Sequence, residues 1–216
     1  MTTAAARPRR RADAERSIAR IVSAARTCLG SDPDATIDDI AKAAGVGRMT
    51  LYGHFRTRPE LVEAALVDAL RVGEETLSAV DLTGDARDAL NRLLASSWSL
   101  VAESAALLAA AQKVLPAGRV RQLHSDAAER VEQLIRQGQD HGAFRTDLPI
   151  TWLVSAVHYL LKGAADEHRA GRLDTADVVP VITGSVQALL AAPPPGPRDS
   201  RQELPRTTSP SAAPAP

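Results

Sequence analysis

The residues with the clearest chemistry lie between Thr36 and Arg58. Several side chains in this stretch donate hydrogen bonds or carry positive charge: Arg48, Thr50, Tyr52, His54 and Arg58. An arginine can donate two parallel hydrogen bonds to a guanine edge, and a threonine can bond a base edge or touch a thymine methyl group. Tyrosine, histidine and a further arginine suit phosphate oxygens. The stretch therefore indicates contact with duplex nucleic acid.

Two short helices are needed to position these side chains. Thr36 followed by Asp39 fits a capping box, which predicts a helix over residues 36–44. Gly45 ends that helix, and a second short helix is expected over residues 47–53. Apolar residues fall on the inner faces of both helices, so the unit is a helix-turn-helix. The start of its second helix then meets base edges in the major groove, through Arg48, Met49 and Thr50.

The capped helix starts offer anion sites as well. Backbone N–H groups near Thr36 and Thr57 are free to bind phosphate oxygens. Tyr52, His54 and Arg58 are expected to contact phosphates beside them. We therefore predict a DNA-binding surface made by Thr36, Arg48, Met49, Thr50, Tyr52, His54 and Arg58.

The rest of the chain is also interpreted as helical, because no sustained alternation of β-branched and aromatic residues occurs. The predicted fold class is all-α. A first helix is expected over residues 13–29, and a long one follows the helix-turn-helix over residues 57–80. Further helices are predicted over residues 85–101, 105–114, 119–139, 149–170 and 177–190.

Both ends of the chain differ from this pattern. Residues 1–12 are predicted to be a flexible basic arm containing Arg7–Arg11, and residues 193–216 a disordered tail rich in proline. The net charge is zero, but it is unevenly distributed. Residues 1–60 hold 11 Lys and Arg against 7 Asp and Glu, whereas residues 61–216 hold 15 against 19. Only the first part therefore suits a polyanion such as DNA.

Several classes of protein are excluded by what the sequence lacks. The lone cysteine, Cys28, cannot form an internal disulfide and fits a reducing cytosol. None of the five histidines stands three or four residues from another, so no helical metal pair exists, and no metal or cofactor is expected. Catalytic motifs such as GxSxG or a phosphate-binding loop are missing, and the chain is predicted not to be an enzyme. Neither a membrane span nor a signal peptide is predicted, which favours the cytoplasm.

Residues 36–61, TIDDIAKAAGVGRMTLYGHFRTRPEL, resemble the DNA-binding signature of the TetR family of bacterial regulators. Many members have Ser or Thr where Gly47 stands, and glycine is a slightly weaker helix cap. The resemblance implies a homodimeric regulator, usually a repressor, that binds a pseudo-palindromic operator in double-stranded DNA. It also implies an N-terminal DNA-binding domain of three helices, here residues 13–57. A larger helical domain, residues 58–192, would bind an unknown small-molecule effector and form the dimer.

Two expectations concern this larger domain. The few aromatic residues outside the DNA-binding unit, together with a histidine in an apolar run, are candidates for an effector pocket: Trp98, Trp152, His158 and Tyr159. Simple core filling is the alternative for the aromatic residues, and a hydrogen-bonded core histidine is the alternative for His158. The last two predicted helices are apolar over much of their surface and are expected to form the dimer interface, with Val186 and Leu190 as the residues to test.

The competing interpretation is a helical protein-interaction module whose helix-turn-helix is degenerate. The polar residues retained at the start and end of the short second helix argue against decay of the DNA-binding unit. The long helix over residues 58–80 would connect the effector domain to the recognition helix and transmit the release of DNA.

Overall fold

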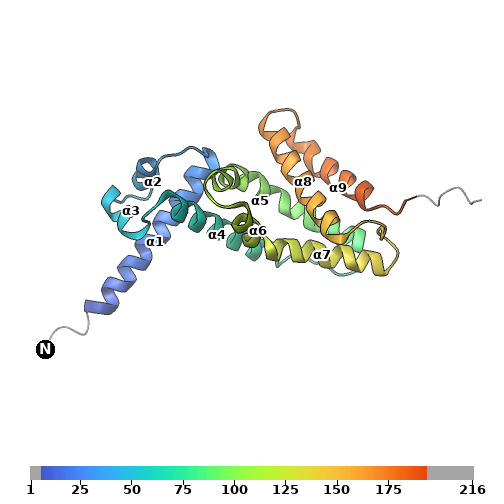
Figure 1. Cartoon of the computed structure of the whole chain (residues 1–216), viewed down its shortest axis with the longest axis horizontal. Helices are drawn as coiled ribbons and strands as arrows, with labels where there is room; N and C mark the ends of the chain where they lie inside the picture. Colours follow the sequence, from blue (N-terminus) through green and yellow to red (C-terminus); the bar gives the residue numbers. More distant parts are fainter. Residues whose placement is uncertain (1–5, 194–216) are drawn as a thin grey trace, which may run out of the picture.

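The computed structural model describes residues 6–193, and this part of the chain is entirely helical, without a strand (Figure 1). The predicted all-α fold is confirmed. The elements are α1 (Ala6–Ser31), α2 (Ile37–Ala43), α3 (Arg48–His54), α4 (Arg58–Leu77), α5 (Ala86–Val114), α6 (Ala117–Leu123), α7 (Ser125–Asp140), α8 (Ile150–Arg169) and α9 (Thr175–Leu190).

Helix α1 begins at Ala6, well before the expected start at Asp13. Alanine and arginine both favour helix, and Pro8 falls in the first turn, where its missing N–H costs no hydrogen bond. The predicted flexible arm over residues 1–12 is therefore wrong for its second half, which is helical. Residues 1–5 and the tail from 194 onward lie outside the described residues.

Two predictions in the middle of the chain are also wrong. The break expected at Glu103 does not exist, since α5 runs unbroken from Ala86 to Val114. Glutamate is a good helix former and Glu103 is exposed, so it interrupts nothing. The single helix expected over residues 119–139 is instead divided into α6 and α7 at His124, whose backbone leaves the helical region (φ −96°, ψ 9°).

Two apolar cores lie at opposite ends of α5. The first core contains Leu107 and Ala111 of α5 and is completed by α1, α2, α3 and the first half of α4. The second contains Leu90 and Leu94 and is completed by α7, α8 and α9. By length and composition α5 could also cross a membrane, but here it is the central helix on which both cores are built.

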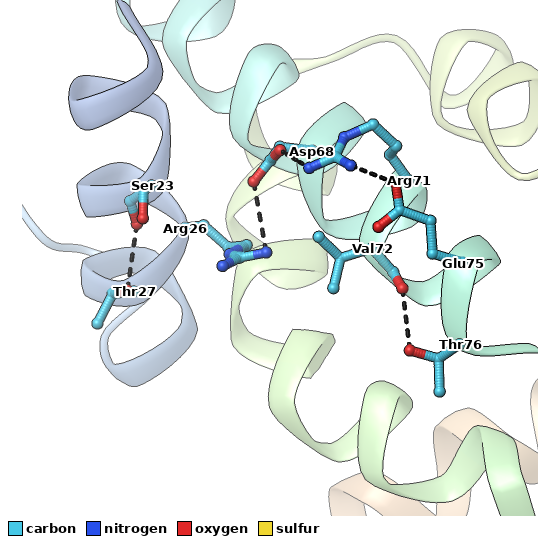
Figure 2. A network of polar contacts seen from close by, with 8 residues as sticks. All are labelled: Ser23, Arg26, Thr27, Asp68, Arg71, Val72, Glu75 and Thr76. Atoms are coloured by element: carbon cyan, nitrogen blue, oxygen red, sulfur yellow. Dashed lines mark hydrogen bonds and ion pairs between the residues drawn. The ribbon is translucent and has the colours of Figure 1, made fainter. Parts of the chain in front are cut away.

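Helix α4 begins beside α3 and is joined to its neighbours by ion pairs on both sides. On one side Arg26 of α1 approaches Asp68 at 3.4 Å, and Asp68 also accepts from Arg71, as Figure 2 shows. On the other side Glu63 accepts from Arg119 of α6 at 2.7 Å, and Glu74 is paired with Arg130 of α7. The ion pairs therefore tie α4 to the N-terminal helices and to the C-terminal helices alike.

Candidate nucleic-acid interface

The start of α2 is fixed by the predicted capping box. Asp39 N–H donates to Thr36 Oγ1 at 3.2 Å, and Thr36 N–H donates to Asp39 Oδ2 at 2.9 Å. Hydrogen bonds from the Thr36 hydroxyl and then its backbone N–H lower the pKa of Asp39. Thr36 is therefore occupied as a helix cap, and the carboxylate of Asp39 stays ionised at neutral pH.

The turn from α2 to α3 depends on Gly45. Its φ of +64° lies in the left-handed region that glycine adopts at low cost. Gly45 N–H donates to Lys42 O, and Val46 N–H donates to Ala41 O at 3.0 Å, which closes the end of α2. The chain then enters α3 at Gly47, which makes no side-chain cap. The predicted helix-turn-helix is present.

Helix α3 is anchored by one side chain and exposes the rest of its N-terminal turn. Leu51 is fully buried against the first core, together with Ile40 of α2. Arg48, Met49 and Thr50 are all exposed, and Met49 is 82% exposed. A thioether left in water has no role in the core, so this turn is free to meet a partner. Tyr52 and His54 are half-buried farther along the helix.

Arg48 is held from two sides. Its Nη1 donates to Asp38 Oδ2 on α2 at 2.8 Å, and its guanidinium carbon lies 5.5 Å from the centre of the Tyr52 ring. The Tyr52 side chain and then the Asp38 carboxylate raise the pKa of Arg48 above its usual range, so the guanidinium stays charged. Sequence patterning did not identify Asp38, because an acidic residue in the first turn of a helix is ordinarily explained by the helix dipole.

Arg58 does not extend into solvent as a free phosphate ligand. Its Nη1 donates to Ala35 O at 2.6 Å and its Nη2 donates to Pro33 O at 3.3 Å. Both carbonyls belong to the loop that leads from α1 to Thr36, and the guanidinium is partly buried there. The structure therefore gives Arg58 a role in fixing that loop, and a phosphate contact remains a prediction.

The four residues proposed for an effector pocket are not brought together. Trp98 is buried and meets the His168 ring edge-on, with ring centres 5.5 Å apart. Trp152 and Tyr159 lie on the outside of α8 with 54% and 69% of their surface exposed. Surface position explains the failure, because a pocket wall must face inward. Two shallow, open hollows lie along α1, and none of these four residues lines them.

His158 is half-buried on α8, and its Nδ1 lies 2.8 Å from Val154 O. A carbonyl only accepts, so Nδ1 carries the proton. Burial lowers the pKa of His158, and the charge of His124 lowers it further, although the bond to Val154 opposes the shift. His158 is therefore neutral at pH 7 and satisfied within its own helix.

The residues chosen to test the dimer interface are wrong as well. Val186 and Leu190 are both fully buried in the second core of the protomer itself. The large apolar side chains that α8 and α9 leave exposed are Trp152, Tyr159 and Val181. Helical periodicity shows that a face is apolar but does not show which helix covers it, and α9 packs on α5 and α8 of its own protomer.

A capped helix, a glycine turn and a second helix with an exposed polar start are the features of a helix-turn-helix DNA-binding protein. Residues 21–65 match the family described as "Bacterial regulatory proteins, tetR family". The HTH-type transcriptional regulator SrpR of Pseudomonas putida is 28% identical over 203 residues, which cover 85% of this chain and 89% of SrpR. The chain is therefore similar to the TetR family of DNA-binding transcriptional regulators, through its residues 21–65 and through its relative SrpR.

Solved structures share the fold. LfrR from Mycobacterium smegmatis, in complex with proflavine, has a TM-score of 0.65 at 22% identity, over 82% of this chain and 97% of LfrR. The fatty acid degradation regulator FadR from Bacillus halodurans has a TM-score of 0.65 at 18% identity, over 80% of this chain and 94% of FadR. RolR in complex with resorcinol has a TM-score of 0.60 at 18% identity, over 84% of this chain and 90% of RolR.

Proposed function

We propose that the protein is a cytoplasmic repressor that binds a pseudo-palindromic operator as a homodimer and leaves it when a small molecule binds. The observation that carries DNA recognition is the exposed first turn of α3, where Arg48, Met49 and Thr50 all face solvent while Leu51 fixes the helix. A recognition helix needs this combination of a buried anchor and an exposed N-terminal turn.

The dimer would form through the outer faces of α8 and α9. Trp152 and Tyr159 are spaced seven residues apart and so share one face of α8, and Val181 of α9 is 45% exposed. Three large apolar side chains in water on two adjacent helices favour burial against a second copy. Two copies related by a two-fold axis would present two α3 helices to successive major grooves, about 34 Å apart.

A matched pair of valines tests this interface. Val181→Asp introduces a charge into the proposed contact, whereas Val67→Asp places the same charge on α4, where Val67 is 44% exposed. We expect Val181→Asp to sediment as a monomer and to lose operator binding, and Val67→Asp to remain a dimer. A wild-type protein that is a monomer at micromolar concentration contradicts the proposal.

Release by an effector is proposed because LfrR and RolR were solved with small molecules bound. In the described state the aromatic candidates do not enclose a cavity, so the second core would have to open to admit a ligand. Movement in the second core would reach the DNA-binding unit through α4. Glu63 and Glu74 of α4 form ion pairs with α6 and α7, and Asp68 forms one with α1.

The two apolar cores support a separate function for each part of the chain. DNA binding is proposed for residues 13–57 and effector binding with dimerisation for residues 58–192. The first core also takes in Leu61, Val62, Ala65 and Leu66 of α4. The start of α4 is therefore part of the structural support of the DNA-binding unit.

A selection from a randomised duplex library tests the function. The wild-type protein should enrich a sequence with two related half-sites, bound by two protomers. Insertion of about five base pairs, half a helical turn, between the half-sites should abolish tight binding, because the two α3 helices would then face different sides of the duplex. Enrichment of no sequence overturns the proposal and favours a helical interaction module.

A further inference from the structure

An ion pair joins the two helices of the DNA-binding unit on its exposed face. Asp38 is in the first turn of α2 and Arg48 is the first residue of α3, and their oxygen and nitrogen atoms are 2.8 Å apart. Both side chains remain about equally exposed, at 60% and 59%. The contact therefore lies at the surface that carries Met49 and Thr50.

Stability does not explain this pair. An ion pair between exposed side chains contributes little to folding, because water screens the charges and the side chains lose freedom. The start of α2 already has its side-chain cap in Thr36 and Asp39, so capping does not account for Asp38. A carboxylate on a surface that must approach DNA also repels the phosphates.

We propose that Asp38 is a specificity-determining positioning residue that holds Arg48 for contact with a base edge and disfavours its contact with phosphate. This inference rests on the proposed function. The guanidinium has five N–H donors, and the hydrogen bond to Asp38 uses one of them. A bidentate contact with guanine needs two N–H donors, so Arg48 can stay bonded to Asp38 while it contacts a guanine edge.

Two physical effects give the pair its selectivity. An arginine whose head is fixed by Asp38 on one side and by the Tyr52 ring 5.5 Å away loses less freedom when it meets a base. The Asp38 charge also offsets the attraction between Arg48 and the DNA backbone, which is the same for every sequence. Asp38 thus weakens non-specific binding and preserves the base contact.

The test combines Asp38→Asn and Arg48→Ala singly and together. Preference at each base pair is measured with variants of the selected duplex, and affinity for random duplex is measured across a range of salt. We expect Asp38→Asn to lower the preference about 10-fold at the base pair that Arg48→Ala also affects. Affinity for random duplex should rise, with a steeper dependence on salt. In the Arg48→Ala background, Asp38→Asn should not change base preference.

Two controls separate positioning from charge and folding. Glu75→Gln removes the same charge and also breaks an arginine pair, with Arg71, but far along α4, and it should leave base preference unchanged. Asp38→Glu keeps the carboxylate and should restore part of the preference. Thermal unfolding of each variant, with a midpoint close to that of the wild type, shows that the fold is intact.

Two results overturn the inference while leaving the proposed function in place. One is an Asp38→Asn variant that keeps the wild-type preference although Arg48→Ala loses it. The other is a change of preference by Asp38→Asn that is equally large without Arg48. A wild-type protein that selects no sequence overturns the proposed function itself.

Discussion

Replacement of Arg58 by alanine distinguishes a structural role from a DNA contact. The guanidinium donates to Ala35 O and Pro33 O, at 2.6 Å and 3.3 Å. A hydrogen bond from a charged donor is worth about 1.5–3 kcal/mol when buried. Arg58 is only partly buried and the second bond is long, so we expect a loss of about 2 kcal/mol in the free energy of unfolding. For a protein of this size that lowers the unfolding midpoint by about 4–8 °C.

The assay pairs thermal unfolding with DNA affinity. Arg56→Ala is the control, because Arg56 is an exposed arginine two residues away and its loss changes the net charge equally. Arg58→Lys keeps the charge but cannot reach both carbonyls with a planar fork, so it should lose most of the same stability. Hydrogen exchange at the amide of Ala35, which donates to Asp32 O, should accelerate in both Arg58 variants.

A phosphate-binding role for Arg58 would give a different result. If Arg58→Ala leaves the unfolding midpoint unchanged but weakens binding to all duplexes alike, with the salt slope reduced by about 0.9 per protomer, then Arg58 is a phosphate ligand. The loop carbonyls would then contribute nothing that the measurement detects.

Three further outcomes follow from particular contacts. Gly138→Ala should lower the free energy of unfolding measured by calorimetry by about 3 kcal/mol, because the new Cβ would lie 2.0 Å from the buried Phe144 ring. Gly118→Ala places its Cβ in open space and should leave the stability unchanged. Because burial lowers the pKa of His158, the unfolded chain takes up a proton at a higher pH than the folded protein does. The free energy of unfolding should therefore fall as the pH drops below about 6.5. Urea titrations at several pH values should show that His158→Gln removes this contribution to the pH dependence of stability. Glutamine at Arg7, Arg9, Arg10 and Arg11 should weaken DNA binding and reduce its salt dependence in fluorescence titrations; unchanged binding would exclude this segment from the interface.

Local signals were sufficient to predict the recognition unit. The Thr36–Asp39 capping box and the Gly45 turn depend on residues within a few positions of one another, and the structure has both. Their chemistry is set by backbone groups that any sequence presents at a helix end. The all-α fold was predictable for the same reason, since helical periodicity is a local property.

Contacts between distant segments were not predictable from the sequence. Arg58 donates to carbonyls 23 and 25 residues earlier. Every residue has a backbone carbonyl, so the sequence does not show which carbonyl will accept a hydrogen bond. The exposure of Trp152 and the burial of Val186 depend on which helix covers each face of α8 and α9. The break between α6 and α7 at His124 involves neither glycine nor proline, so no residue type in the sequence predicts it.

The most direct test of the central claim is a binding titration of the wild-type protein and Arg48→Ala against the DNA upstream of the protein's own gene and a random duplex of equal length, repeated over a range of salt. We expect the wild-type protein to prefer the upstream DNA by at least about 1000-fold. Arg48→Ala should keep its fold and lower that preference by about 5–150-fold. Equal affinity of the wild-type protein for both duplexes at every salt concentration contradicts the central claim.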